Sequence, residues 1–149
     1  MGARLHSEGS REGSGCSARE PVPISDEVEG GESSDAAQSL VADAQRFLVE
    51  RLETLSETRG RFEANVRLPI PCGANPYLEV GLLSRRDRLA VMFDSEDGLG
   101  DAERYRLARR EDWLLQKNGY RVFRLLAEDI CVRLDATLDF IFQTVVPSV

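Results

Sequence analysis

Glu79 and Asp94 are the residues of this chain best placed to hold a cation together. Each belongs to one of two consecutive apolar runs, which a short charged turn joins, and this pattern predicts a β-hairpin. Residues two apart on a strand point to the same face. If Gly81 lies opposite Met92, Glu79 therefore lies opposite Asp94. Two facing carboxylates would suit a hard divalent cation such as Mg²⁺.

The same spacing has a second explanation, in which neither carboxylate binds a metal. Like charges placed directly opposite destabilise a strand pair by up to about 1 kcal/mol, so each acid gains from a cation, an arginine or a shared proton. Glu79 could instead reach Arg67, and Asp94 could end its strand and cap the acidic loop that follows. This second interpretation is the simpler one, and the sequence leaves both open.

A second group of residues could contact nucleic-acid phosphates. It consists of arginines in the hairpin turn and on the helix expected after it: Arg85, Arg86, Arg106, Arg109 and Arg110. Ion pairs within the helix are an equally good explanation, because acids stand three or four residues from these arginines, at Glu103, Glu111 and Asp112. We expect the nearby aromatic side chains to pack between helix and sheet. These are Tyr105, Trp113 and Tyr120.

Seven periodic segments must position these side chains. A helix is expected from Asp35 to Gly60, and the first strand should place Ala64, Val66 and Leu68 on one side by alternation. The strands are expected at 61–70, 77–83, 88–94 and 120–126, with a loop at 95–100 and further helices at 101–118 and 130–145. This order of one helix, three strands, a helix, a strand and a helix predicts an α/β domain.

Residues 1–34 differ from the rest in composition. They are rich in Gly, Ser and Glu and show no helical or strand period, so we predict a disordered acidic tail at 1–34 and a domain at 35–147. Residues 1–45 hold three Arg against nine Asp and Glu, whereas residues 46–149 hold sixteen Lys and Arg against seventeen acids. The negative charge therefore belongs mainly to the tail, and bulk charge gives no support to nucleic-acid binding.

Histidine and cysteine usage excludes several enzyme classes. His6, the only histidine, lies in the tail, which excludes a Ser/His or Cys/His catalytic pair within the domain. The three cysteines show neither disulfide nor zinc spacing, so a cytoplasmic location is expected. No run approaches the ~20 apolar residues of a membrane span, and no membrane association is expected. The oligomeric state is left open.

Three stretches of the chain resemble one family of enzymes that cut DNA. They are 78–83, 88–94 and 105–124, and the third contains the pattern RRxDxLLQxxGYxVxR, followed by Ala127, Glu128 and Asp129. Together they resemble the endonuclease-like domain related to the very-short-patch mismatch repair endonuclease, a branch of the PD-(D/E)xK nucleases. The resemblance implies a restriction-endonuclease-like αβββαβ core with a closing C-terminal helix. It also implies a Mg²⁺-dependent phosphodiesterase that acts on DNA.

The chain departs from this family where the family binds its metal. The family hairpin reads L-E-V-D-L-L and then L-A-V-E-I-D-G, with a histidine a few residues later. Gly81, Met92 and Gly98 replace the aspartate, the glutamate and the histidine, whereas Asp94 is kept. Glycine has no side chain and a thioether is a soft ligand, so neither suits Mg²⁺. The resemblance therefore implies a catalytically impaired nuclease that could still bind DNA.

Two other functions are left open by the sequence. An active endonuclease could use Glu79 and Asp94 with a bound Mg²⁺ and an activated water, and without such activity no cofactor is expected. The fold could also act only as a protein-interaction scaffold. Mg²⁺-dependent nicking that disappears in Asp94→Ala would indicate the enzyme, and salt-dependent DNA binding without nicking would indicate the impaired nuclease.

Overall fold

The structure is a computed structural model that describes residues 32–146, with side chains from Asp35 onward. Nearly all of the predicted tail at 1–34 lies outside the described residues, as does Pro147, the expected end of the last helix. The first helix already begins at Glu32, three residues before the expected start. No helix between residues 32 and 146 is long and apolar enough to cross a membrane.

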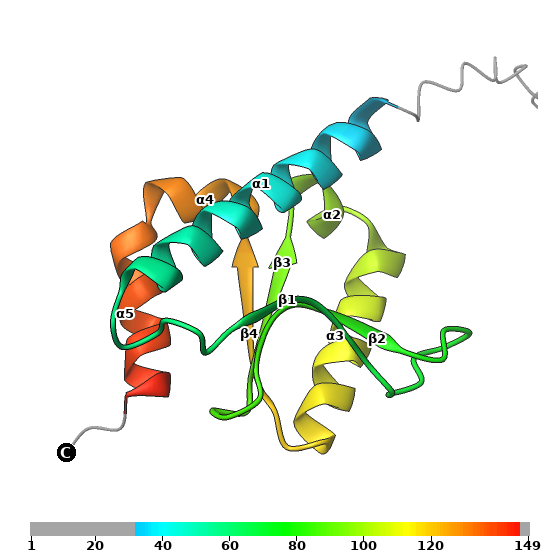
Figure 1. The fold of residues 1–149 in the computed structure, drawn as a ribbon. Helices are drawn as coiled ribbons and strands as arrows, with labels where there is room; N and C mark the ends of the chain where they lie inside the picture. The colour runs from blue at the N-terminus through cyan, green and yellow to red at the C-terminus, as the bar shows by residue number, and fades with distance from the viewer. Residues whose placement is uncertain (1–31, 147–149) are drawn as a thin grey trace, which may run out of the picture.

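Between residues 32 and 146, three consecutive strands follow the first helix, and the fourth strand stands between helices (Figure 1). They are α1 (Glu32–Thr54), β1 (Glu63–Leu68), β2 (Leu78–Ser84), β3 (Leu89–Asp94), α2 (Glu96–Leu99), α3 (Ala102–Lys117), β4 (Arg121–Leu126), α4 (Ala127–Val132) and α5 (Leu134–Val145). The strands form one mixed sheet in the order β1-β2-β3-β4, in which β1, β2 and β3 pair antiparallel and β4 is parallel to β3. The α/β class expected from the sequence is confirmed.

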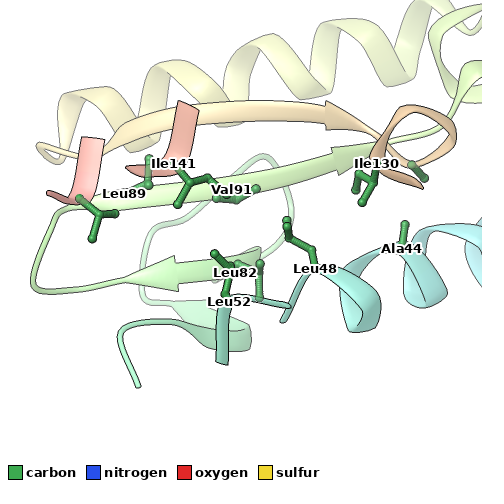
Figure 2. Packing of buried hydrophobic residues seen from close by; sticks show 10 residues of the cluster. Ala44, Leu48, Leu52, Leu82, Leu89, Val91, Ile130 and Ile141 are labelled. Atoms are coloured by element: carbon green, nitrogen blue, oxygen red, sulfur yellow. The ribbon is translucent and has the colours of Figure 1, made fainter. Parts of the chain in front are cut away.

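The sheet lies between two helical layers. Apolar side chains from α1, α4 and α5 pack on one face, and Figure 2 shows how they meet Leu82, Leu89 and Val91 of the sheet. The helical side chains of this cluster include Ala44, Leu48, Leu52, Ile130 and Ile141. On the other face, Leu115 of α3 packs with Val66, Leu78, Val80, Ala90 and Met92. The helix α3 connects the parallel strands β3 and β4 and covers this second face.

The predicted alternation of the first strand is interrupted at Asn65. Val66 and Leu68 pack under α3, but Ala64 pairs with Leu82, which packs under α1. Asn65 adopts a φ of 52°, and neither it nor Gly81 opposite takes part in the β1–β2 pairing. The prediction that Ala64 shares a side with Val66 and Leu68 is therefore wrong, because one left-handed residue reverses the side on which the following residues project.

The first helix ends at Thr54, six residues before the expected end at Gly60. Side chains from the turn that follows satisfy the last carbonyl groups of α1, because Thr58 Oγ1 donates to Leu52 O at 2.7 Å and Arg59 Nε donates to Glu53 O at 3.0 Å. Gly60 does adopt a positive φ of 69°, but it closes the turn and not the helix.

The expected closing helix at 130–145 is two helices. The chain bends at Arg133, between α4 and α5, so that Ile130 and Ile141 both reach the core under α1. Apolar residues at helical spacing predict a helix but not a bend within it. One straight helix would carry some of these apolar residues away from the twisted sheet. The loop expected at 95–100 likewise contains the short helix α2, which Ser95 caps.

Candidate functional site

The hairpin that carries Glu79 and Asp94 forms as predicted, and its turn covers 85–88, one residue later than the expected 84–87. Ser84 Oγ donates to Asp87 Oδ2 at 2.6 Å across this turn. The β2–β3 pairing runs from Ser84 opposite Leu89 to Leu82 opposite Val91 and then stops. Gly81 and Met92 would be the next pair in this register, but the two strands separate there (Figure 1).

A cavity of about 370 Å³ lies where the two strands separate. Its walls come from α1, β1 and the two diverging strands, and they include Gln45, Asn65, Arg67, Glu79, Gly81, Met92 and Phe93. Gln45 Nε2 donates to Gly81 O and to Asn65 Oδ1, each at 3.0 Å. The interrupted strand pairing leaves the Gly81 carbonyl and the Asn65 side-chain oxygen without partners on the neighbouring strand, and Gln45 donates to both.

The two positions that lack the family carboxylates have different surroundings. A Cβ atom on Gly81 would lie 2.5 Å from Cδ2 of Phe93, so the Phe93 ring takes the space that a side chain at position 81 would need. Met92 is 7% exposed and packs with Val80 and Leu115 under α3. The space beside position 81 is therefore filled by Phe93 on the α1 side of the sheet, and Met92 is part of the apolar core below α3.

Glu79, on β2, pairs with the neighbouring strand β1. Its Cα partner in the sheet is Arg67, whose Nε donates to Glu79 Oε1 at 3.0 Å. Both side chains are more than 60% exposed, so this ion pair contributes less than about 1 kcal/mol. The contact is the one expected under the second interpretation of the sequence.

Asp94 is held far more firmly, by Arg124 of β4. Arg124 Nη1 donates to Asp94 Oδ1 at 2.8 Å, Nε donates to Asp112 Oδ1 at 2.6 Å, and Nη2 donates to Glu111 Oε2 at 2.9 Å. The carbonyl of Ala108 accepts a further bond from Nη2. The Arg124 side chain is only 12% exposed. The end of β3 is thereby tied to the middle of α3.

The charges around Arg124 favour its cationic form. Burial alone would lower the pKa of Arg124. Hydrogen bonds to Glu111 and Asp112 and the charges of Asp94 and Asp112 have the opposite and larger effect, so the pKa lies above the ordinary arginine value. Arg109 Nη2 also approaches Asp112 Oδ2 at 3.1 Å. Three carboxylates and two guanidinium groups thus form one network.

Glu79 and Asp94 do not provide the donor set that Mg²⁺ needs. The β2–β3 pairing ends before reaching them, so they are not cross-strand neighbours, and each already accepts a bond from an arginine. Mg²⁺ requires oxygen donors in a nearly octahedral array. Among the described side chains, no group of three or more Asp, Glu, His or Cys could hold a metal ion. The residues present therefore do not fit the expected ion.

The loop after Asp94 is fixed by polar contacts around α2. The Gly98 amide donates to Ser95 Oγ at 3.3 Å, and the Glu96 amide donates to Glu128 Oε1 at 3.1 Å. Gly98, where the family has histidine, brings no side chain to this loop. Asp101 caps α3 by accepting bonds from its first amide groups.

The arginines predicted to contact phosphates lie in two places. Arg85, in the hairpin turn, donates to Glu63 of β1 at 3.0 Å, and Arg86 is exposed. Arg106 and Arg110 are exposed on α3 and form no ion pair within residues 35–146, whereas Arg109 is paired with Asp112. The alternative of a fully paired helix face is therefore only partly realised, because Glu111 and Asp112 point to Arg124.

The expectation that the aromatic residues pack between helix and sheet holds only for Tyr120, which lies against the cluster under α3. Trp113 is 58% exposed and Tyr105 is 50% exposed. Each is covered on one side by a cation of the same helix, with Lys117 Nζ 5.0 Å from the Trp113 ring centre and Arg109 5.3 Å from that of Tyr105. The prediction for these two residues is wrong because Leu114 and Leu115 supply the packing face of α3.

The sequence alone did not identify Arg124 as the residue that holds Asp94. The signal was present in the spacing of Asp112 and Arg124 within the RRxDxLLQxxGYxVxR pattern, but pairing across a helix and a strand cannot be read from spacing. No protein-family model, curated protein sequence or solved structure matches this chain.

Proposed function

We propose that this chain is a member of the PD-(D/E)xK nuclease superfamily that binds DNA and no longer cuts it. The sheet order β1-β2-β3-β4, with a helix before it and the crossover helix α3 between parallel strands, is compatible with the αβββαβ core that the sequence resemblance implies. The fold alone does not determine an activity, so the proposal depends on the side chains of the hairpin.

The observation that carries the proposal is the state of the retained acid Asp94. Its carboxylate is bound by the buried Arg124, which also holds Glu111 and Asp112. A metal ion would have to displace a guanidinium group that makes four hydrogen bonds. Glu79 is more easily freed, but one exposed carboxylate is a poor Mg²⁺ site.

Binding to DNA is supported by the arginines of α3. Arg106 and Arg110 are exposed and carry no ion pair in the described part of the chain, so their charges are available to phosphates. Such contacts release counterions and make the affinity depend on salt. A scaffold for proteins would not require cations at these positions.

The test uses the purified full chain with labelled DNA in the presence of Mg²⁺ or Mn²⁺. We expect binding that weakens as salt is raised, without nicking or cleavage. The variant Arg106→Ala/Arg110→Ala should weaken binding, whereas the matched variant Arg46→Ala/Arg51→Ala, with the same charge change on α1, should not. Cleavage that is lost in Asp94→Ala would instead indicate an active enzyme, and the absence of DNA binding would leave the scaffold.

A restoration experiment tests the family assignment separately. The variant Gly81→Asp/Met92→Glu restores the two family acids, but the Phe93 ring would meet the new side chain at position 81. The family pattern has isoleucine where this chain has Phe93. Carboxylates at positions 81, 92 and 94 together would attract Mg²⁺ strongly enough to compete with the single bond from Arg124 to Asp94. We therefore expect metal-dependent cleavage only when Phe93→Ile is added to the other two substitutions. A folded triple variant that neither binds metal nor cuts would contradict the assignment.

A further inference from the structure

The outward face of α3 carries aromatic residues and cations without exposed acids. At 100° per residue, Tyr105, Arg109, Trp113, Arg106, Lys117 and Arg110 fall within an arc of about 140° around the helix axis. All six are exposed. Glu103 lies at the edge of this arc, and Glu111 and Asp112 are turned to Arg124. We refer to these six side chains as the α3 face.

The burial of Glu111 and Asp112 determines the charge of this face. On sequence spacing alone, both acids could neutralise arginines three or four residues away. Arg124 binds both carboxylates on the sheet side of α3, where they are 24% and 13% exposed, and of the arginines on the α3 face only Arg109 is paired among the described residues, with Asp112. Arg106, Arg110 and Lys117 form no ion pair within residues 35–146, so the α3 face keeps a net positive charge.

Each of the two aromatic rings on the α3 face lies beside a cation of the next helical turn. Tyr105 is followed four residues later by Arg109, and Trp113 is followed four residues later by Lys117, with each cation near the ring. The two rings are eight residues apart, which is about 12 Å along a helix. Each ring therefore offers a surface on which a base can stack, and Lys117, which forms no ion pair within residues 35–146, also offers a charge for the adjacent phosphate.

We infer that the α3 face binds single-stranded nucleic acid, with unpaired bases stacked on Trp113 and Tyr105 and phosphates held by Arg106, Arg110 and Lys117. This inference rests on the proposed function and specifies which form of nucleic acid is bound and where. A paired duplex hides the faces of its bases, so rings on a convex helix can stack only on bases that are unpaired. An acidic protein segment would use the cations but would gain nothing from base stacking.

Trp113 provides a direct test because it is the only tryptophan of the chain. Its fluorescence is measured while the full-length protein is titrated with oligothymidine of about 12 nucleotides, a length within the range bound by known single-strand sites. We expect strong quenching, and weaker binding to a blunt duplex of the same length. Oligouridine in a parallel titration distinguishes RNA from DNA as the preferred strand.

Variants then separate stacking from charge. Trp113→Ala should weaken binding, measured with a labelled oligonucleotide, by roughly 5- to 150-fold, and Trp113→Phe should retain most of the affinity. Phe140→Ala, which removes a 62% exposed ring from α5, should have no effect. Arg106→Gln/Arg110→Gln should lower the slope of log affinity against log salt by about 1.4, whereas Arg51→Gln on α1 should leave it unchanged.

The outcomes distinguish the single-strand inference from the proposed DNA-binding function. Salt-dependent nucleic-acid binding with unchanged Trp113 fluorescence and full affinity in Trp113→Ala would overturn this inference and leave the proposed function standing. Equal quenching by a polyglutamate peptide of the same charge would also overturn it, in favour of an acidic protein partner. Absence of binding to every nucleic acid would overturn both claims. Thermal unfolding of each variant checks that the fold is intact.

Discussion

The Phe93 ring lies where a side chain at position 81 would be. A Cβ atom on Gly81 would be 2.5 Å from Cδ2 and 2.8 Å from Cε2 of Phe93. Such distances are far shorter than the 3.5–4.0 Å at which carbon atoms attract one another. Glycine at 81 and phenylalanine at 93 are therefore complementary, and changing one alters what the other position tolerates.

Gly81→Ala should destabilise the protein by about 1–2 kcal/mol, because the added methyl group overpacks against the ring. In a Phe93→Ala background the same substitution should be neutral or stabilising by about 0.5 kcal/mol, since alanine restricts the unfolded chain more than glycine does. Urea unfolding of the four proteins measures this coupling. Equal effects of Gly81→Ala in both backgrounds would show that the ring does not occupy this space.

Replacement of Arg124 by methionine should destabilise the fold by about 3 kcal/mol. It leaves Asp94, Glu111 and Asp112 half-buried without their shared cation. The control Arg133→Met removes an exposed arginine whose contact with Asp129 is 3.9 Å long, and should change stability by less than about 0.5 kcal/mol. Adding Asp112→Asn to Arg124→Met should recover part of the loss, and no recovery would contradict a charge-based role.

The contribution of Arg124 to stability should not depend on pH above neutrality. Its pKa is raised above the ordinary arginine value in the folded state. The contribution is therefore complete below the unfolded pKa and is lost only as pH rises through the folded pKa, beyond the usual working range. The difference in unfolding free energy between the natural protein and Arg124→Met should be equal at about pH 7 and about pH 10.

Arg124→Lys keeps the charge but not the arrangement of donors. The carboxylates that raise the pKa of Arg124 would also oppose the lowering that burial causes for a lysine, so the charge at position 124 is retained at about pH 7. One ammonium group cannot reproduce the four hydrogen bonds of the guanidinium group, so we expect Arg124→Lys to be less stable than the natural protein in urea unfolding, but more stable than Arg124→Met. Equal stability of the lysine and methionine variants would mean that charge at position 124 is not what holds the network.

Asn65 should tolerate glycine better than alanine. Its φ of 52° lies in the left-handed region, which costs most residues about 1–2 kcal/mol but costs glycine little. Both variants lose the bond from Gln45, so the alanine variant should be less stable by about 1 kcal/mol. Glu63, in ordinary strand conformation on β1, should show the opposite order, with glycine worse than alanine.

Much of the fold could be predicted because its signals are local. The hairpin, whose turn at 85–88 lies one residue later than expected, and the end of α3 depend on neighbouring residues, and Gly119 after α3 adopts a positive φ of 85°. The apolar runs at 77–83 and 88–94 placed Gly81, Met92 and Asp94 on the correct strands. The metal, the DNA and the cleavage remain predictions that await the experiments above.

What could not be predicted depends on contacts between distant segments. Periodicity indicated one closing helix, but core packing divides it at Arg133. The aromatic residues of α3 were expected to pack on the sheet, whereas two leucines cover the sheet and Trp113 faces solvent. A pattern of apolar residues does not say which of several competing side chains will take the inner positions.

The sequence by itself determined the order of the four strands and of the helices α1 and α3 that accompany them, the α/β class and the absence of acids at positions 81 and 92. Only the tertiary structure decided which groups the remaining charged side chains pair with. Glu111 and Asp112 could have paired only with arginines of their own helix, but Arg124, twelve residues beyond Asp112, binds both from the sheet, and only Asp112 also keeps a pair on the helix, with Arg109. The reason is physical: ion pairs form between groups that packing brings within a few ångströms, and that proximity depends on how β4 docks beside β3.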